Sequence, residues 1–486
     1  MFRVLIRYRG DLRLKPAADI PAIWFLLCLG MGTFAGLAQT DSEFQAAQSR
    51  SIAATPSPDI PDYVKPIDDS FVFDVLSKAD KPDWLLFGVE HRNRLQHRDQ
   101  NYRSDEINSQ LLLLGRTLIY GGITDVMDPL RLHFEAINSR DIGGDAPPSS
   151  RNLNYLDIQQ FHAELLLPDQ LYFEDLSLKA GRMSFDFVDR RLIARNRFRN
   201  TINNFDGLRL TASTDIFNGR PSPIEVFALR PVDLHFTGFD QTSDTQFLFG
   251  AGARDIHWHE LHLEPYWILL TDRSGTGSYA GLHTAGLHVF GTGVESESGF
   301  LDFDADFAIQ SGRDANNQDV SAWAAHLEIA YNFDTSWKPR AALWFNASSG
   351  DHSSNSSNGT SNAFNSLFGA TYGFFGFTSF FNWENVLNPA IHLRVHPRKG
   401  HRLETIYRLY WLQNGDAGWS RANRQPTPGN NNPFVGTELD IRYIMRMTRL
   451  SSLESGMAFF FPGEYVKSTG PAPLGSFFYT AITLKL

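Results

Sequence analysis

Residues 181–210 hold the densest group of side chains in this chain that could do chemistry. Arginines and carboxylates alternate there with aromatic and amide residues, and the candidates are Arg182, Asp189, Arg191, Arg195, Arg199, Asn200, Asp206 and Arg209. The planar guanidinium fork binds carboxylates bidentately and stays charged in confined places. Interleaved aspartates would hold such guanidinium groups in position. The pattern predicts a binding site for anions, with the alternative that residues 190–199 form a solvated surface loop.

The elements that position these residues follow from a two-residue alternation of apolar and charged side chains. In residues 300–309 the odd positions are apolar, and the even positions include three carboxylates, Asp302, Asp304 and Asp306. Successive side chains of a strand point to opposite faces, so this segment predicts a strand with one apolar and one acidic face. The same alternation places Arg131 and Arg442 on the charged faces of two other strands.

This alternation recurs over roughly 400 residues without helical periodicity. A soluble barrel or sandwich would show the same pattern, but the length exceeds what one soluble sandwich needs. After residue 37 no apolar run is long enough for a transmembrane helix. We therefore expect an all-β fold, a single large antiparallel transmembrane β-barrel with a polar lumen. Long loops are expected at residues 138–153, 271–281, 311–320, 348–361 and 414–434, and short turns at 334–338 and 397–400.

The N-terminus has the features of a secretory leader. Basic residues up to Lys15 precede an apolar core at 20–37 that ends in small residues, with a retained transmembrane anchor as the alternative. The expected organisation is a signal peptide at 1–38, a flexible lead-in at 39–80 and a barrel at 81–486 in the bacterial outer membrane. Cys28, the only cysteine in the sequence, lies in the leader, so no disulfide is expected in the mature chain.

The charge argues against one class of partner. The full chain has a formal net charge of −10, and its leader holds five basic and two acidic residues, so the mature chain is near −13. Nucleic acid is therefore not an expected partner. Only nine of the 44 basic residues are lysines, which suits recognition of carboxylates, although a GC-rich genome would produce the same bias.

Two motifs resemble the alginate export family of outer-membrane barrels. The first comprises Gly181-Arg182, Arg191-Leu192, Arg199-Asn200 and Phe205-Asp206-Gly207 with Arg209, and is similar to the family's Gly-Arg, Arg-Leu, Arg-Asn and Phe-Asp-Gly-Arg elements. The second comprises Ser348-Ser349-Gly350-Asp351 and Phe364-Asn365-Ser366-Leu367-Phe368-Gly369. It is similar to the family's Ser-Gly-Asp turn and the Phe-Leu-Phe element that follows it. The chain ends in Leu486 where this class usually has an aromatic residue.

The resemblance implies a monomeric barrel of about 18 strands with an arginine-lined pore for an anionic uronate polymer. Arg182, Arg191 and Arg199 are then expected in the lumen. The implied partners are outer-membrane lipid, an anionic polysaccharide or small anions, and periplasmic secretion partners. The alternatives are a general small-solute porin and, less favoured, a β-rich polysaccharide-acting or lipolytic enzyme.

No catalytic residue, cofactor or metal is expected. The one group of metal-ligand types, His257, His259 and His262 with Glu260 and Glu264, would be divided between the two faces of a single strand.

Overall fold

The computed structural model describes residues 65–66 and 84–486, apart from 105, 107, 146, 148, 170–171, 218, 276–277, 315–316, 352–358 and 430–431. The expected signal peptide at 1–38, and the lead-in at 39–80 except for residues 65–66, lie outside the described residues. The described elements are β1 (Lys65–Pro66), β2 (Leu85–Asp99), β3 (Gln110–Met127), β4 (Leu130–Gly144), β5 (Asn154–Leu166), β6 (Glu174–Met183), β7 (Phe205–Thr214), β8 (Ser222–Asp233), β9 (Gln241–Thr242), β10 (Gln246–Ala253), β11 (Ile256–Trp258), β12 (Leu261–Asp272), β13 (Tyr279–Ser296), β14 (Gly299–Asp314), β15 (Asp319–Phe333), β16 (Arg340–Ser348), β17 (Thr360–Ser361), β18 (Val386–Val395), β19 (His401–Trp411), η2 (Gly415–Ala417), η3 (Ser420–Ala422), β20 (Phe434–Thr448), β21 (Ser451–Pro462), α4 (Glu464–Thr469) and β22 (Gly475–Lys485).

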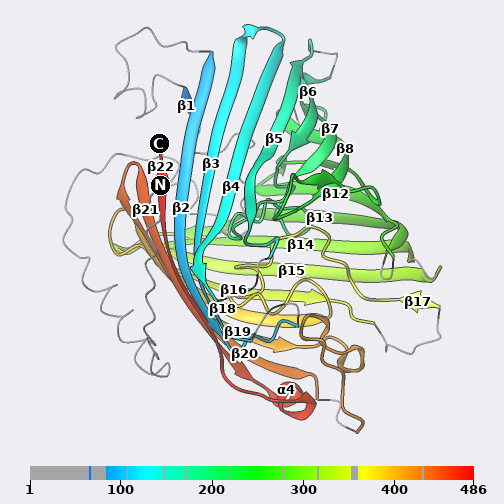
Figure 1. Ribbon diagram of the computed structural model, residues 1–486, viewed down its shortest axis with the longest axis vertical. Helices are drawn as coiled ribbons and strands as arrows, with labels where there is room; N and C mark the ends of the chain where they lie inside the picture. Colours follow the sequence, from blue (N-terminus) through cyan, green and yellow to red (C-terminus); the bar gives the residue numbers. More distant parts are fainter. Residues whose placement is uncertain are drawn as a thin grey trace, which may run out of the picture. The chain divides into compact units, whose positions relative to one another are not determined.

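Eighteen of these strands form a closed antiparallel barrel (Figure 1). Each long strand pairs with the next along the chain, and β22 closes the ring by pairing with β2, for example Asn93 with Ile482. Four short strands add to this ring: β1 beside β2, β9 beside β8, β11 beside β12, and β17 parallel to β15. Closure removes the exposed sheet edges that an open sheet of this length would present.

The alternation predicted for residues 300–309 is confirmed in β14. The side chains of Asp302, Asp304 and Asp306 are buried inside the barrel, and Asp304 is only 3% exposed. Phe307, on the other parity, is 53% exposed on the outer face. The register of β14 with β15 continues without a shift through this segment, and that with β13 does so from Asp302 onward, so the neighbouring strands keep the same inward parity there.

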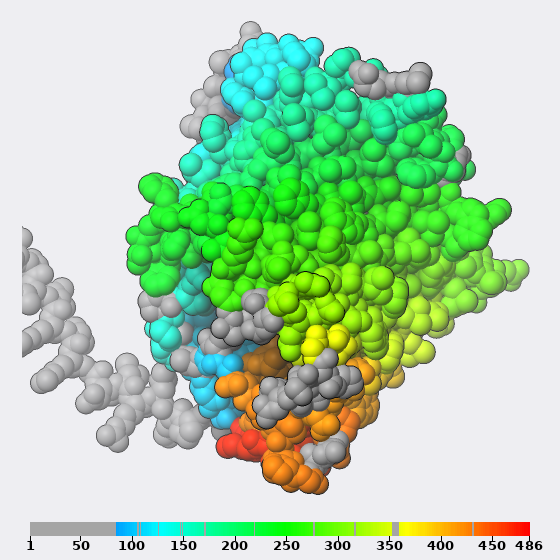
Figure 2. All heavy atoms as spheres, turned by 90° about the vertical axis from the view of Figure 1, so that its right-hand side faces the viewer, coloured from blue at the N-terminus to red at the C-terminus, as the bar shows by residue number. Residues whose placement is uncertain are grey.

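Large apolar side chains project outward from strands all around the barrel. Phe161 on β5, Leu208 on β7, Leu343 on β16 and Ile391 on β18 are each at least half exposed, and Leu343 reaches 64%. Figure 2 shows one face, on which the residues of the green and yellow-green strands form a continuous surface. No helix among the described residues has the length and apolar character needed to cross a membrane.

The connections differ at the two ends of the barrel. One end carries short turns, including those at 334–339 and 396–400, as predicted. The other end carries the long connections, among them 349–385 and 412–433, which confirms two of the predicted long loops. The prediction of a long loop at 311–320 is wrong, because β14 continues to Asp314 and β15 begins at Asp319.

Two long connections fold back into the barrel. The first inward loop, residues 184–204, joins β6 to β7, and the second inward loop, residues 362–385, leads into β18. Their apolar residues are buried, as for Phe187, Ile193 and Phe381. Phe187 packs edge-on against Tyr266 of β12 with ring centroids 6.2 Å apart, so the first loop contacts the inner wall. The interior is therefore shaped by these loops as well as by the strands.

Candidate functional site inside the barrel

The two inward loops pack against each other through their backbones. Phe368 donates its N–H to the carbonyl of Leu192 at 2.9 Å, and Ala370 donates to that of Arg190 at 3.0 Å. Gly369 is required at this approach, because a Cβ there would lie 1.8 Å from the carbonyl oxygen of Arg191. The two sequence motifs, far apart in the chain, thus form one joined structure inside the barrel.

An arginine cluster lies where the first inward loop meets β2 and β3; it consists of Arg92, Arg94, Arg116, Arg197 and Arg199. The two terminal nitrogens of Arg92 donate to the carbonyls of Arg197 and Arg199 at 2.9 and 2.8 Å. Arg116 donates to the carbonyl of Arg197 at 2.9 Å, and Arg94 donates to that of Phe198. The strand arginines therefore hold the loop in place through its backbone.

The arginine cluster carries more positive charge than its close carboxylate partner balances. Glu90 forms ion pairs with Arg116 at 2.8 Å and with Arg197 at 2.9 Å. Among the described residues, the guanidinium groups of Arg92 and Arg94 donate hydrogen bonds to carbonyl oxygens and have no carboxylate oxygen within 4.0 Å. A positive field therefore acts on this side of the barrel interior.

Arg199 adds to that field from the loop itself. It donates to the amide oxygen of Asn203 at 2.9 Å. Burial, together with nearby Arg103, lowers the pKa of Arg199 to about 10, which still leaves the guanidinium protonated at neutral pH.

On the other side of the first inward loop, a carboxylate balances the positive charge of the loop arginine. The Arg191 Nε lies 2.7 Å from Asp189 Oδ2, and Arg191 Nη1 donates to the amide oxygen of Asn346 on β16 at 3.2 Å. Phe374 of the second inward loop stacks on this guanidinium, with its centroid 4.5 Å away. Burial raises the pKa of Asp189, and the field of Asp304 adds to the shift. Arg191 is thus a buried, paired group that joins the loops to the wall.

The expectation that Arg182 lies in the lumen is wrong, although Asp206 does hold it by hydrogen bonds as expected. They pair with each other through Nε–Oδ1 at 2.8 Å and Nη2–Oδ2 at 2.9 Å, but they share the outward parity with Leu208. The glycines beside them take the inward positions, because strand side chains alternate. The Gly-Arg and Phe-Asp-Gly motifs therefore place glycine inside the barrel and the ion pair on its outer side.

The remaining predicted residues lie inside and have structural partners. Arg209 pairs with Glu225 at 2.6 Å, both side chains being almost fully buried, and Arg442 pairs with Glu404. Asn200 donates to the carbonyls of Gly115 and Asn152 at 3.1 and 2.9 Å, which anchors the first inward loop. Arg131 shares the inward parity of buried His133 on β4.

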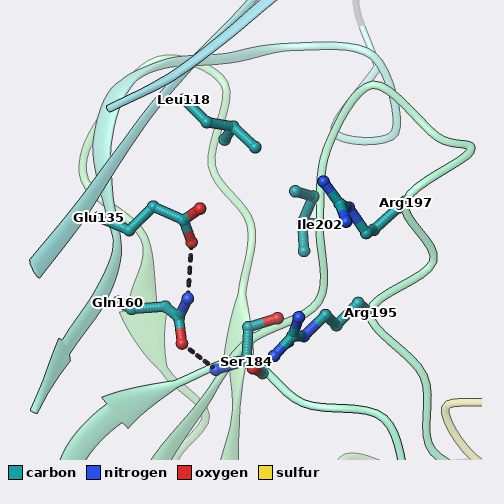
Figure 3. A pocket seen from close by; sticks show the side chains of 7 residues that line it. All are labelled: Leu118, Glu135, Gln160, Ser184, Arg195, Arg197 and Ile202. Carbon is teal, nitrogen blue, oxygen red and sulfur yellow. Dashed lines mark hydrogen bonds between the residues drawn. The ribbon is translucent and has the colours of Figure 1, made fainter. Parts of the chain in front are cut away.

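Arg195 lies beside a narrow space that is also lined by Glu135, Gln160, Ser184 and Arg197 (Figure 3). Its Nε donates to the carbonyl of Ser184 at 2.9 Å. Gln160 on β5 links Glu135 on β4 to the first inward loop. It donates to Glu135 at 2.7 Å and accepts from the N–H of Ser184 at 3.1 Å. The side chains of Arg195 and Arg197 both lie close to this space in Figure 3.

Sequence reasoning missed Arg92, Arg94 and Arg116 as members of the site. The signal was present in the alternation of β2, where Glu90, Arg92 and Arg94 share one parity and are buried. The sequence does not show that this face contacts residues 197–199, which lie about a hundred positions away. That contact arises only when the barrel closes and the loop folds inward.

The comparisons with known proteins agree with this architecture. The family model described as alginate export matches residues 83–480. The chain belongs to the alginate export family. No curated protein matches the chain.

The chain is similar to several solved structures, among them the outer-membrane protein OprD. OprD from Pseudomonas aeruginosa is 13% identical with a TM-score of 0.57, over 83% of this chain and 94% of that one. OccAB2 from Acinetobacter baumannii is 12% identical with a TM-score of 0.58, over 83% and 98%. OpdO from Pseudomonas aeruginosa is 13% identical with a TM-score of 0.55, over 83% and 97%. At these identities the likeness shows the barrel fold, and with the family it supports an outer-membrane channel.

Proposed function

We propose that this protein is an outer-membrane channel that passes an anionic polysaccharide, an alginate-like uronate polymer, or related small anions. Three findings support the proposal: membership in the alginate export family, the closed barrel, and the outward apolar side chains that suit contact with lipid. In such a channel the end of the barrel with the short turns faces the periplasm. The channel acts as a monomer, and periplasmic secretion partners would deliver or receive the polymer there.

The observation that carries the choice of an anionic substrate is the arginine cluster. Arg92 and Arg94 donate hydrogen bonds to the carbonyls of residues 197–199, which are neutral. Their positive charge therefore acts on a solute that enters the lumen. Conduction requires attraction that brings an ion in and binding weak enough to release it. Guanidinium groups that already have hydrogen-bond partners meet both conditions, since they attract a carboxylate without offering it a full bidentate site.

A general small-solute porin is the second candidate, and the acidic wall favours it. Asp302, Asp304 and Asp306 on β14 are all buried in the interior, where Asp302 pairs with Arg340 and Asp304 lies 3.2 Å from His288, so this wall combines acidic and basic groups. A lumen with both signs of charge suits mixed small solutes as well as anions. We propose no catalytic role and no cofactor for this protein.

Solute flux into proteoliposomes distinguishes these candidates. The purified barrel is reconstituted, and entry of a labelled oligouronate is compared with that of a neutral oligosaccharide of equal length. The proposal predicts faster entry of the oligouronate, and a loss of that preference at high salt, because screening weakens the arginine field. Equal entry of the two sugars would favour the small-solute porin. Recovery of the protein from the periplasm without detergent would contradict both channels.

A further inference from the structure

A compact group of metal-ligand side chains lies at the short-turn end of the barrel. It consists of Asp255, His257 on β11 and His262 on β12, and none of these belongs to the channel site described above. Sequence reasoning divided these histidines between two strand faces. That is wrong, because the chain reverses at residues 259–260 and β11 pairs back on β12 with His257 directly across from His262.

The three side chains converge at distances that suit one ion. One ligand atom from each lies within 4.8 Å of the others. The two imidazole centroids are 4.4 Å apart, with their planes tilted by 59°. Nδ1 of His257 lies 2.9 Å from the carbonyl of Asp255, which can only accept, so Nδ1 carries the proton and Nε2 carries the lone pair for a metal.

The surroundings hold this group in shape. The ring of His262 stacks on Phe290 of β13, with centroids 4.6 Å apart and planes within 9°. Nδ1 of His262 lies 2.5 Å from Asp255 Oδ1, so these two ligand atoms already face the same point, and a bound ion would displace the proton that they share. Asp255 in turn donates its backbone N–H to Glu264 at 3.3 Å. Side chains that are already held in place lose less conformational entropy when an ion binds.

The group is also accessible. The His262 side chain is 27% exposed and that of Asp255 is 43% exposed. His262 shares the inward parity of buried Glu264, so the group lies on the lumen side of the short-turn end. An ion in the surrounding solution can reach it.

We propose that Asp255, His257 and His262 form a binding site for a divalent transition-metal ion of the Zn²⁺ type. Two imidazoles and one carboxylate are ligands that Zn²⁺ accepts, and water completes a four-coordinate shell. Ca²⁺ and Mg²⁺ are disfavoured because they select oxygen ligands. A bound ion would fasten the turn between β10 and β12 at the mouth of the barrel.

Titration of the full chain with Zn²⁺ tests this proposal. The protein is purified without a polyhistidine tag, kept in detergent, and titrated with ZnCl₂ in a calorimeter. We expect one tight site per chain, weakened at least about tenfold in His257→Ala and in His262→Ala. His259→Ala is the matched control, because His259 lies on the same turn but outside the group, and its isotherm should equal that of the parent.

The coordination is read independently with Cu²⁺ as the probe. Electron paramagnetic resonance of the parent should show nitrogen coupling from two imidazoles, and each histidine variant should lose one. Heat-modifiable mobility on a gel verifies that the variants keep a folded barrel. Unchanged Zn²⁺ affinity in folded His257→Ala and His262→Ala, or equal loss in His259→Ala, would overturn the proposal and leave a hydrogen-bonded turn without a metal.

Discussion

Neutralising Arg199 should weaken the preference of the channel for anions. Arg199 belongs to the first inward loop, and its Nη2 donates to the Asn203 amide oxygen at 2.9 Å. Glutamine keeps a donor for that oxygen while it removes the charge. Arg199→Gln is therefore a change of electrostatics with little change of packing.

The size of the effect follows from Coulomb's law. An anion that passes at about 7 Å from the guanidinium gains about 0.6 kcal/mol in water, and about 1.2 kcal/mol if the confined lumen halves the dielectric constant. Loss of that attraction lowers the permeability to anions by about threefold to sevenfold, since 1.4 kcal/mol is a factor of ten, and the anion-to-cation permeability ratio falls by at least as much. The ratio is obtained from the reversal potential of single channels in a planar bilayer under a KCl gradient.

Arg182→Gln is the matched control for this prediction. Arg182 lies in the same arginine-rich stretch and has the same chemistry, but it pairs with Asp206 on the outward parity. Its neutralisation should leave the permeability ratio unchanged. If Arg182→Gln lowers the ratio as much as Arg199→Gln, the assignment of inward and outward positions in this segment is refuted.

Three further predictions concern stability. Leu343→Arg should destabilise the barrel in lipid by about 2–4 kcal/mol, measured by urea unfolding in vesicles, because Leu343 projects outward from β16, whereas Trp337→Arg in a short turn should cost much less. Arg209→Ala should cost about 1–3 kcal/mol in the same assay, since it leaves buried Glu225 to the more distant Arg254 at 3.5 Å, and a cost below about 0.5 kcal/mol would contradict the pairing. Asp240 lies in the loop between β8 and β9, and burial raises its pKa from 3.8 to about 6, so the folded loop binds more protons than the open one and loses stability as the pH rises between those values. Hydrogen exchange of this loop, corrected for the intrinsic rate, should therefore be slower at about pH 4 than at about pH 7, and Asp240→Asn should remove the difference.

The barrel could be predicted from sequence because its information is local. Alternation such as Asp302, Asp304 and Asp306 against apolar neighbours needs only the two-residue period of a strand, and the structure buries all three carboxylates. Short turns were also predictable, since residues 334–338 and 397–400 carry turn-forming residues between alternating segments. The loop expected at 311–320 is wrong, because β14 extends through Gly312, which has a φ of 143°, as far as Asp314.

The site was only partly predictable because its geometry depends on register and on distant contacts. The composition of residues 181–210 indicated anion chemistry, but only strand pairing shows that Arg182 faces outward while Arg209 faces inward. Likewise, the contact of Arg191 with Asn346 joins residues 155 positions apart. Such contacts follow from the closed ring and the inward loops, which no local pattern encodes.

The measurement that tests the central proposal most directly is the ion selectivity of the unmodified protein. Purified barrel is inserted into a planar bilayer, and the reversal potential of single channels is recorded under a KCl gradient. The arginine cluster at Arg92, Arg94 and Arg199 predicts a reversal potential shifted toward that of chloride, and a current that oligouronate reduces more than a neutral oligosaccharide does. A cation-selective pore, or a current that is indifferent to oligouronate, would contradict an anionic substrate.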